Sequence, residues 1–167
     1  MANYKGHLAG AVAAATVYVG GLTVLPGEWS AESNVILSSW QAVAAIFVVA
    51  MLFGLWPDID TNSKAQDIFF GIAFAADIAL IAVGRLEAAA YLGLLAMTPI
   101  VGKHRGWTHS KLACLLVPVP IVLVPYIYQP DNLVLGLIFY GAAVTGYFSH
   151  LLLDGLIWRR FRIKGGS

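Results

Sequence analysis

Charged residues and cysteines are scarce in this chain. Only 11% of its 167 residues are Asp, Glu, Lys or Arg, whereas soluble globular proteins contain about 25%. Such a composition excludes an ordinary water-soluble domain. The single cysteine, Cys114, excludes an intramolecular disulfide framework, and its place in an apolar run predicts a packing role.

Hydrophobic residues are abundant instead, at 59% of the chain, and the mean hydropathy is +0.78. A helix needs about 20 apolar residues to cross a hydrocarbon core about 30 Å thick. Apolar runs of roughly this length occupy residues 8–25, 35–56, 68–84, 88–101, 112–128 and 133–158. The sequence therefore predicts an all-α integral membrane protein, folded as a compact bundle of about six transmembrane helices.

Two of these runs contain residues that are unusual in a membrane span. Pro118, Pro120 and Pro125 lie in the fifth run, where they should kink or break the helix. Asp77 lies in the third run. An intramembrane carboxylate is a functional candidate by default, and the alternative is a neutral Asp that is hydrogen-bonded inside the bundle.

Lys and Arg are distributed unevenly among the connections. If the N-terminus is cytoplasmic, nine of the ten lie on the cytoplasmic side and Arg85 alone lies on the other, which is a strong positive-inside bias. We therefore predict a multi-pass protein of the inner (cytoplasmic) membrane with both termini in the cytoplasm. Residues 1–164 are predicted to form a single transmembrane helical domain, and residues 165–167 are interpreted as a cloning remnant.

All four histidines fall on the predicted cytoplasmic side, and carboxylates accompany them. His7 lies at the entry of the first run, His104 and His109 lie in the connection HRGWTHS, and His150 lies in the last run, four residues before Asp154. Positions four apart share a helix face, so His150 and Asp154 can point at one ion, or Asp154 can orient His150. Placed about eight residues from the end of the last run, His150 is expected about 12 Å inside the helix. The competing interpretation is a hydrogen bond that only joins two helices.

Two connections on the same side carry further polar groups. The segment LWPDID places Asp58 and Asp60 directly after the second run. Carboxylate oxygens suit hard or borderline metal ions, although helix caps and solvated loops also use Asp. In HRGWTHS, Arg105 can hold a phosphate or carboxylate in its planar fork, and the histidines can ligate a metal or move a proton. A basic loop attracted to anionic lipid is the alternative, but it does not account for the histidines.

Together these motifs resemble a known family. An early histidine, PDxD after a hydrophobic helix, HRGxTHS and a final HxxxD are similar to the pattern of the YdjM-like family of predicted membrane-bound metal-dependent hydrolases, over nearly the whole chain. The resemblance implies a membrane metal-dependent hydrolase. The positions that match its pattern are His7, Asp58, Asp60, His104, Arg105, Thr108, His109, His150 and Asp154.

These residues allow roles to be assigned. Mixed His and Asp ligands suit zinc, with manganese or iron as alternatives, and the number of candidates leaves room for one or two ions. The predicted metal ligands are His7, Asp58, His109, His150 and Asp154. Asp60 is predicted to be a bridging ligand or general base, and His104 the proton donor to the leaving group. Arg105 and Thr108 are predicted to bind the substrate, with Arg105 holding its negative charge.

We expect a membrane-embedded metal-dependent hydrolase with its site facing the cytoplasm. A lipid headgroup can reach a polar site about 10 Å below the surface from the side, so a phospholipid or other lipid-linked ester, including a phosphoester, is the expected substrate. Membrane lipids are the expected partners, with no nucleic acid, and the sequence indicates no particular oligomeric state. The alternatives are a metal-ion or proton transporter, which Asp77 favours, and a non-catalytic metal-binding membrane protein.

Overall fold

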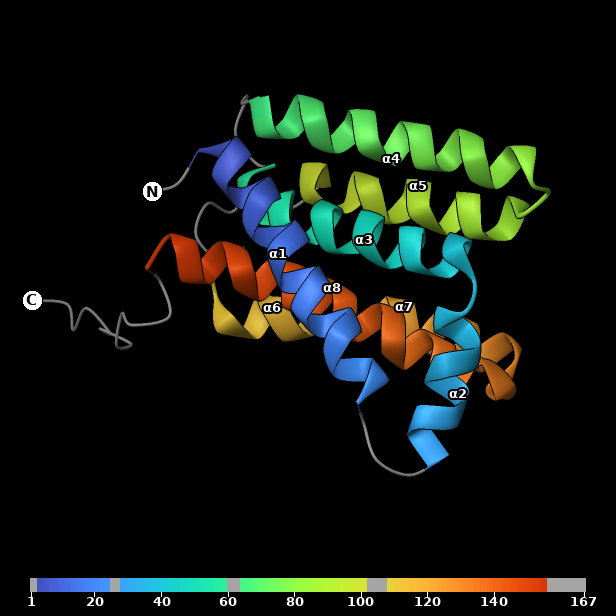
Figure 1. The fold of residues 1–167 in the computed structure, drawn as a ribbon. Helices are drawn as coiled ribbons and strands as arrows, with labels where there is room; N and C mark the ends of the chain where they lie inside the picture. The colour runs from blue at the N-terminus through green and yellow to red at the C-terminus, as the bar shows by residue number, and fades with distance from the viewer. Residues whose placement is uncertain (1–2, 25–27, 60–63, 102–107, 156–167) are drawn as a thin grey trace, which may run out of the picture.

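The computed structural model describes residues 3–24, 28–59, 64–101 and 108–155, and these form helices without any strand (Figure 1). The elements in chain order are α1 (Tyr4–Thr23), α2 (Glu28–Leu37), α3 (Trp40–Leu55), the 3-10 turn η1 (Trp56–Asp58), α4 (Lys64–Ala82), α5 (Leu86–Val101), α6 (Lys111–Leu116), α7 (Pro120–Tyr128), the 3-10 turn η2 (Pro130–Asn132) and α8 (Leu133–Leu153). The prediction of an all-α protein is confirmed for this part of the chain.

Within the described residues, four segments are long and apolar enough to cross a membrane. They are Tyr4–Thr23, Trp40–Asp58, Lys64–Ala82 and Pro130–Leu153. The apolar segments Leu86–Met97 and Lys111–Ile127 are shorter than a full span. Four candidate spans are therefore established by length and composition, and the count of six stays a prediction.

Helices α1, α3 and α8 pack together as the centre of the bundle, with α1 entering where α3 and α8 end (Figure 1). Glycines at their crossings allow the backbones to come close. A Cβ on Gly146 of α8 would collide with the Ala50 carbonyl of α3, and a Cβ on Gly54 of α3 would lie 2.7 Å from the Cβ of Ala11 in α1. Small residues of this kind are a common means of close helix association in membranes.

The α4 and α5 helices form a separate hairpin that lies along one side of α3 (Figure 1). Gly84 makes the turn between them with φ +77°, a left-handed conformation that glycine adopts without steric cost. Asp77 of α4 faces α5 at Gly93, where a Cβ would lie 3.9 Å from its Oδ2. The carboxylate predicted inside the third run thus lies between two helices.

The fifth predicted run is broken as its prolines predict. Helix α6 ends at Leu116, and α7 begins at Pro120 after a turn that contains Pro118. Pro120 occupies the first turn of α7, where its missing N–H leaves no hydrogen bond unmade. Helices α6 and α7 both pack against α8.

Two predicted boundaries are wrong. The second run does not begin at residue 35, because residues 28–37 form α2 and the side chain of Ser39 then caps α3 by accepting a hydrogen bond from the Ala42 N–H. The last run does not reach residue 158, because α8 ends at Leu153 and Gly155 follows with φ +68°. His150 therefore lies in the last turn of α8, and the expected depth of 12 Å inside the helix is too large.

Candidate metal centre

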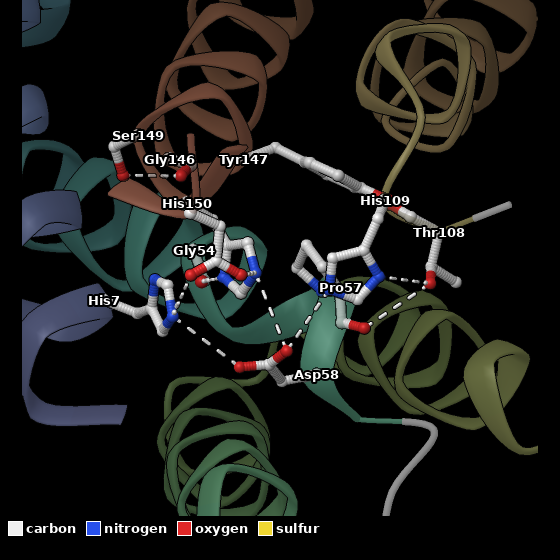
Figure 2. Close-up of polar contacts among 11 residues, drawn as sticks. His7, Gly54, Pro57, Asp58, Thr108, His109, Gly146, Tyr147, Ser149 and His150 are labelled. Atoms are coloured by element: carbon white, nitrogen blue, oxygen red, sulfur yellow. Dashed lines mark hydrogen bonds and ion pairs between the residues drawn. The ribbon is translucent and has the colours of Figure 1, made fainter. Parts of the chain in front are cut away.

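The first turns of α1, the turn η1, the start of α6 and the end of α8 meet at one place (Figure 2), and local features of the sequence position the first three. The side chain of Asn3 caps α1 and places His7 in its first turns. Pro57 in η1 turns the chain after α3 so that Asp58 follows at the turn. Ser110 caps α6, so His109 comes just before that helix. These boundaries bring residues from distant parts of the sequence to one place.

The turn that carries Asp58 is held by buried apolar neighbours. Trp56 and Ile59 are each 2% exposed and lie on either side of it in sequence. The Trp56 ring stacks on Phe53 of α3 at 5.4 Å and meets Phe69 of α4 edge-on at 5.7 Å. This packing fixes η1 between α3 and α4 and leaves the Asp58 side chain directed at the histidines.

Four of the predicted ligands form a compact group. One ligand atom from each of Asp58, His109, His150 and Asp154 lies within 4.8 Å of all the others. His109 Nε2 is 3.4 Å from Asp58 Oδ1, and His150 Nε2 is 3.6 Å from Asp58 Oδ1 and 3.6 Å from Asp154 Oδ2. These distances exceed those of good N–H···O hydrogen bonds. They approach the spacing of about 3.3 Å between ligand atoms that each lie about 2.0–2.1 Å from a tetrahedral zinc ion.

The orientation of His150 is set by a backbone carbonyl. Its Nδ1 lies 2.8 Å from the Gly54 oxygen, and a carbonyl only accepts, so Nδ1 must carry the proton. In the neutral ring the lone pair is then on Nε2, which faces both carboxylates. Histidines that bind a metal through one ring nitrogen usually donate the N–H of the other ring nitrogen to a carbonyl or carboxylate. His150 has this arrangement.

His109 is oriented through Thr108. The Thr108 hydroxyl lies 3.4 Å from the Pro57 oxygen and 3.2 Å from His109 Nδ1. Because it has one proton and the carbonyl only accepts, the consistent arrangement has Thr108 donating to Pro57 and accepting from Nδ1–H. The lone pair of His109 Nε2 is then directed at Asp58.

The Thr108 hydroxyl is therefore already hydrogen-bonded within the protein. It is 2% exposed, and its backbone carbonyl accepts a hydrogen bond from the Tyr147 hydroxyl of α8. The side chain predicted to bind substrate contacts a histidine and a turn instead. Sequence reasoning missed Tyr147, although its place three residues before His150 on the same face of α8 was a usable signal.

His7 lies beside the group of four rather than within it. Its ring stacks on that of His150 with centroids 3.8 Å apart and planes inclined by 16°. Its Nε2 is 3.7 Å from Asp58 Oδ2 (Figure 2) and 3.6 Å from Asp154 Oδ1, so it faces the other oxygen of each carboxylate.

The cluster is closed on one side and open on the other. His7 and His150 are fully buried and the Asp154 side chain is 2% exposed, whereas the side chains of Asp58 and His109 are 27% and 22% exposed. Asp154 is also the C-terminal cap of α8, where the negative end of the helix dipole disfavours a carboxylate. A cation at this place would offset the unfavourable free energy of burying the Asp154 carboxylate at the negative end of the helix dipole. Imidazole nitrogen and carboxylate oxygen together form a donor set that suits zinc, manganese or iron.

Three predicted site residues lie outside the described part of the chain. Asp60 belongs to residues 60–63, and His104 and Arg105 belong to residues 102–107. Their roles as general base, proton donor and anion binder stay predictions.

Comparison with known proteins identifies a family. The model of the YdjM inner membrane protein family matches residues 1–160, a range that contains every residue of the cluster. No curated protein and no solved structure matches the chain. Because the match covers nearly its whole length, the chain belongs to the YdjM inner membrane protein family.

Proposed function

We propose that this protein is a membrane-embedded metal-dependent hydrolase whose ion is held by Asp58, His109, His150 and Asp154. The observation that carries the proposal is the fixed direction of two imidazoles. His150 and His109 each have an acceptor for Nδ1–H, the Gly54 carbonyl and the Thr108 hydroxyl, and each directs Nε2 at a carboxylate oxygen 3.4 to 3.6 Å away.

The group is suited to zinc, with manganese or iron as alternatives. A divalent ion held there would supply Lewis acidity toward an ester oxygen and toward the attacking water. The chain's own contribution is to hold four donors in place before substrate arrives. Burial of His150 and Asp154 keeps bulk water from one side, and the partly exposed Asp58 and His109 leave the other side accessible to substrate.

We assign roles to three further residues from their positions in the sequence. Asp60, two residues after Asp58, is assigned as the general base or as a further ligand. His104 is assigned as the proton donor to the leaving group, and Arg105 as the group that holds a substrate phosphate in its planar fork.

The assigned position of the site supports a lipid-linked substrate. We assign six spans with both termini in the cytoplasm, since nine of ten Lys and Arg fall on that side. The cluster then faces the cytoplasm at the inner membrane, at helix ends rather than deep in a span. Ester bonds of lipid headgroups lie at that level, which favours a phospholipid or other lipid-linked phosphoester as substrate.

Elemental analysis of the detergent-purified protein tests the metal centre, with His109→Ala and His150→Ala beside the wild type. We expect at least about one equivalent of zinc, manganese or iron in the wild type and a loss in both variants. Thr16→Ala is the matched control, because Thr16 is an exposed residue of α1 whose hydroxyl bonds within the helix. A wild type that is folded and free of metal contradicts the proposal.

Hydrolysis is measured separately. Phospholipid vesicles incubated with the metal-loaded protein are expected to release headgroup or phosphate, and the release should stop with a chelator and return when metal is added. A protein that binds metal but cleaves no phospholipid and no lipid-linked ester supports a non-catalytic metal-binding function instead.

Transport is the second candidate, and Asp77 is the observation that favours it. Its Oδ1 is buried and has no hydrogen-bond partner among the described residues, and intramembrane ionisable groups often mark ion paths. Asp77 lies about 20 Å along α4 from Lys64 by the helix rise. Metal or proton flux in proteoliposomes that disappears with Asp77→Asn, in the absence of hydrolysis, would establish this function.

A further inference from the structure

The position of His7 is not explained by a single ion at the group of four. Its imidazole is fully buried, and neither ring nitrogen has a hydrogen-bond partner among the residues that the structure describes. Stacking on His150 fixes the plane of the ring. A polar side chain buried in this way normally has a hydrogen-bond partner or a metal ion.

In both Asp58 and Asp154, one carboxylate oxygen faces His7 and the other faces His150. Asp58 Oδ1 faces His109 and His150, while Asp58 Oδ2 faces His7 at 3.7 Å. Asp154 is divided in the same way, with Oδ2 toward His150 and Oδ1 toward His7 at 3.6 Å. Carboxylates that offer one oxygen to each side are suited to bridging two cations, and ions in two-metal hydrolytic sites lie about 3.5–4 Å apart.

We propose that a second divalent cation binds between His7 Nε2, Asp58 Oδ2 and Asp154 Oδ1, so that Asp58 and Asp154 bridge two ions. This inference rests on the proposed function, because the first ion is the one held by the group of four. The spacing between His7 and the two oxygens matches that within the group of four.

The two positions differ in the number of protein ligands. The first has four donors, two imidazoles and two carboxylate oxygens, so that an ion there would take up water or substrate by expanding from four to five ligands. The second has three donors among the described residues, and three protein ligands leave a place for water or substrate, as in catalytic zinc sites. The second ion is therefore the weaker bound and the more readily exchanged.

The competing explanation is a protonated His7 held by the two carboxylates without any second ion. Both explanations place His7 where it is, but they differ in stoichiometry. With a second ion, replacing His7 removes one cation and leaves the group of four intact. With an ion pair alone, replacing His7 leaves the number of bound cations unchanged.

The test is a Mn²⁺ titration of metal-depleted full-length protein, followed by equilibrium metal analysis and electron paramagnetic resonance. The wild type is expected to bind about two equivalents and to give the broadened spectrum of a spin-coupled pair. His7→Ala and His7→Gln are expected to bind about one equivalent with the hyperfine-split spectrum of isolated Mn²⁺. Thr16→Ala, on the same helix, should behave as the wild type.

Each result separates the two proposals. A wild type that binds one ion with an isolated-Mn²⁺ spectrum overturns this inference and leaves the metal-dependent hydrolase standing. Two equivalents retained in folded His7→Gln also overturn it. A wild type that binds no metal contradicts both. Because the wild-type spectrum decides the question by itself, a failure of His7→Ala to fold does not remove the test.

Discussion

Two carboxylates in this bundle, each with one buried oxygen, have opposite surroundings. Asp154 at the end of α8 lies 3.6 Å from the imidazoles of both His7 and His150. Asp77 in α4 lies against Gly93, and its Oδ1 has no hydrogen-bond partner in the described part of the chain. The same residue type in two apolar helices thus belongs to a prepared cluster in one case and stands apart in the other. What distinguishes them is the set of neighbours and the backbone groups that orient those neighbours.

The largest effect on metal content and hydrolysis is expected from Asp58→Ala, with Asp77→Ala as its comparison. Asp58 supplies an oxygen to each proposed ion, so its loss should reduce bound metal to none and hydrolysis to the uncatalysed rate. Asp77→Ala should keep the wild-type metal content, because no imidazole faces that carboxylate among the described residues. Metal analysis of both purified variants makes the measurement. Equal metal contents would show that the comparison between the two carboxylates is mistaken.

Gly146→Ala compared with Gly71→Ala contrasts the central helices with the hairpin. The added methyl group at residue 146 would meet the Ala50 backbone, whereas nothing lies within 4 Å at residue 71. We expect Gly146→Ala to lower the free energy of unfolding by about 1–3 kcal/mol, as overpacking does, and Gly71→Ala to leave it nearly unchanged. Thermal unfolding in detergent checks this, and a stable Gly146→Ala would mean that α3 and α8 are less closely packed.

Thr108→Val removes the hydroxyl that orients His109 and keeps the shape of the residue 108 side chain. Because such supporting hydrogen bonds contribute about 10–100-fold to metal affinity, we expect a weakening of that size with the fold retained. Competition with a chromophoric chelator measures the affinity. If the affinity is unchanged, His109 does not depend on the hydroxyl for its direction.

The smallest effect on stability and metal affinity is expected from Tyr147→Phe. The change removes only the hydroxyl that donates to the Thr108 carbonyl, and one hydrogen bond contributes about 1 kcal/mol to stability. We expect a loss of stability near that value and a smaller loss of metal affinity than in Thr108→Val. An effect on affinity as large as that of Thr108→Val would give Tyr147 a direct role in placing His109.

Much of the fold follows from the apolar runs, and the departures from it have local causes. The runs predict α1, α3, α4 and α8 because each is long and apolar. The break between α2 and α3 depends on one capping side chain, Ser39, and the end of α8 depends on Gly155. Hydropathy averages over such single residues, so it joins or extends helices that a cap or a glycine terminates.

The site was predictable in its residue types but not in its geometry. The spacing of His150 and Asp154, and the family pattern, predict which side chains belong together. The acceptors that orient His150 and Thr108 are the backbone carbonyls of Gly54 and Pro57, and a carbonyl is present at every position of any sequence. The division of carboxylate oxygens between His7 and the other histidines depends on helix crossing angles, which the sequence does not display.

The cluster draws its donors from the first helix, the turn after α3, the start of α6 and the last helix. During synthesis, the helices that precede α8 therefore carry an incomplete set of donors into the membrane. Only when Asp154 has been added and α8 has docked beside α1 and α3 is the set complete. An ion held by these four donors would therefore be bound only once α8 has docked, and a chain that ends before α8 would lack two of the four donors.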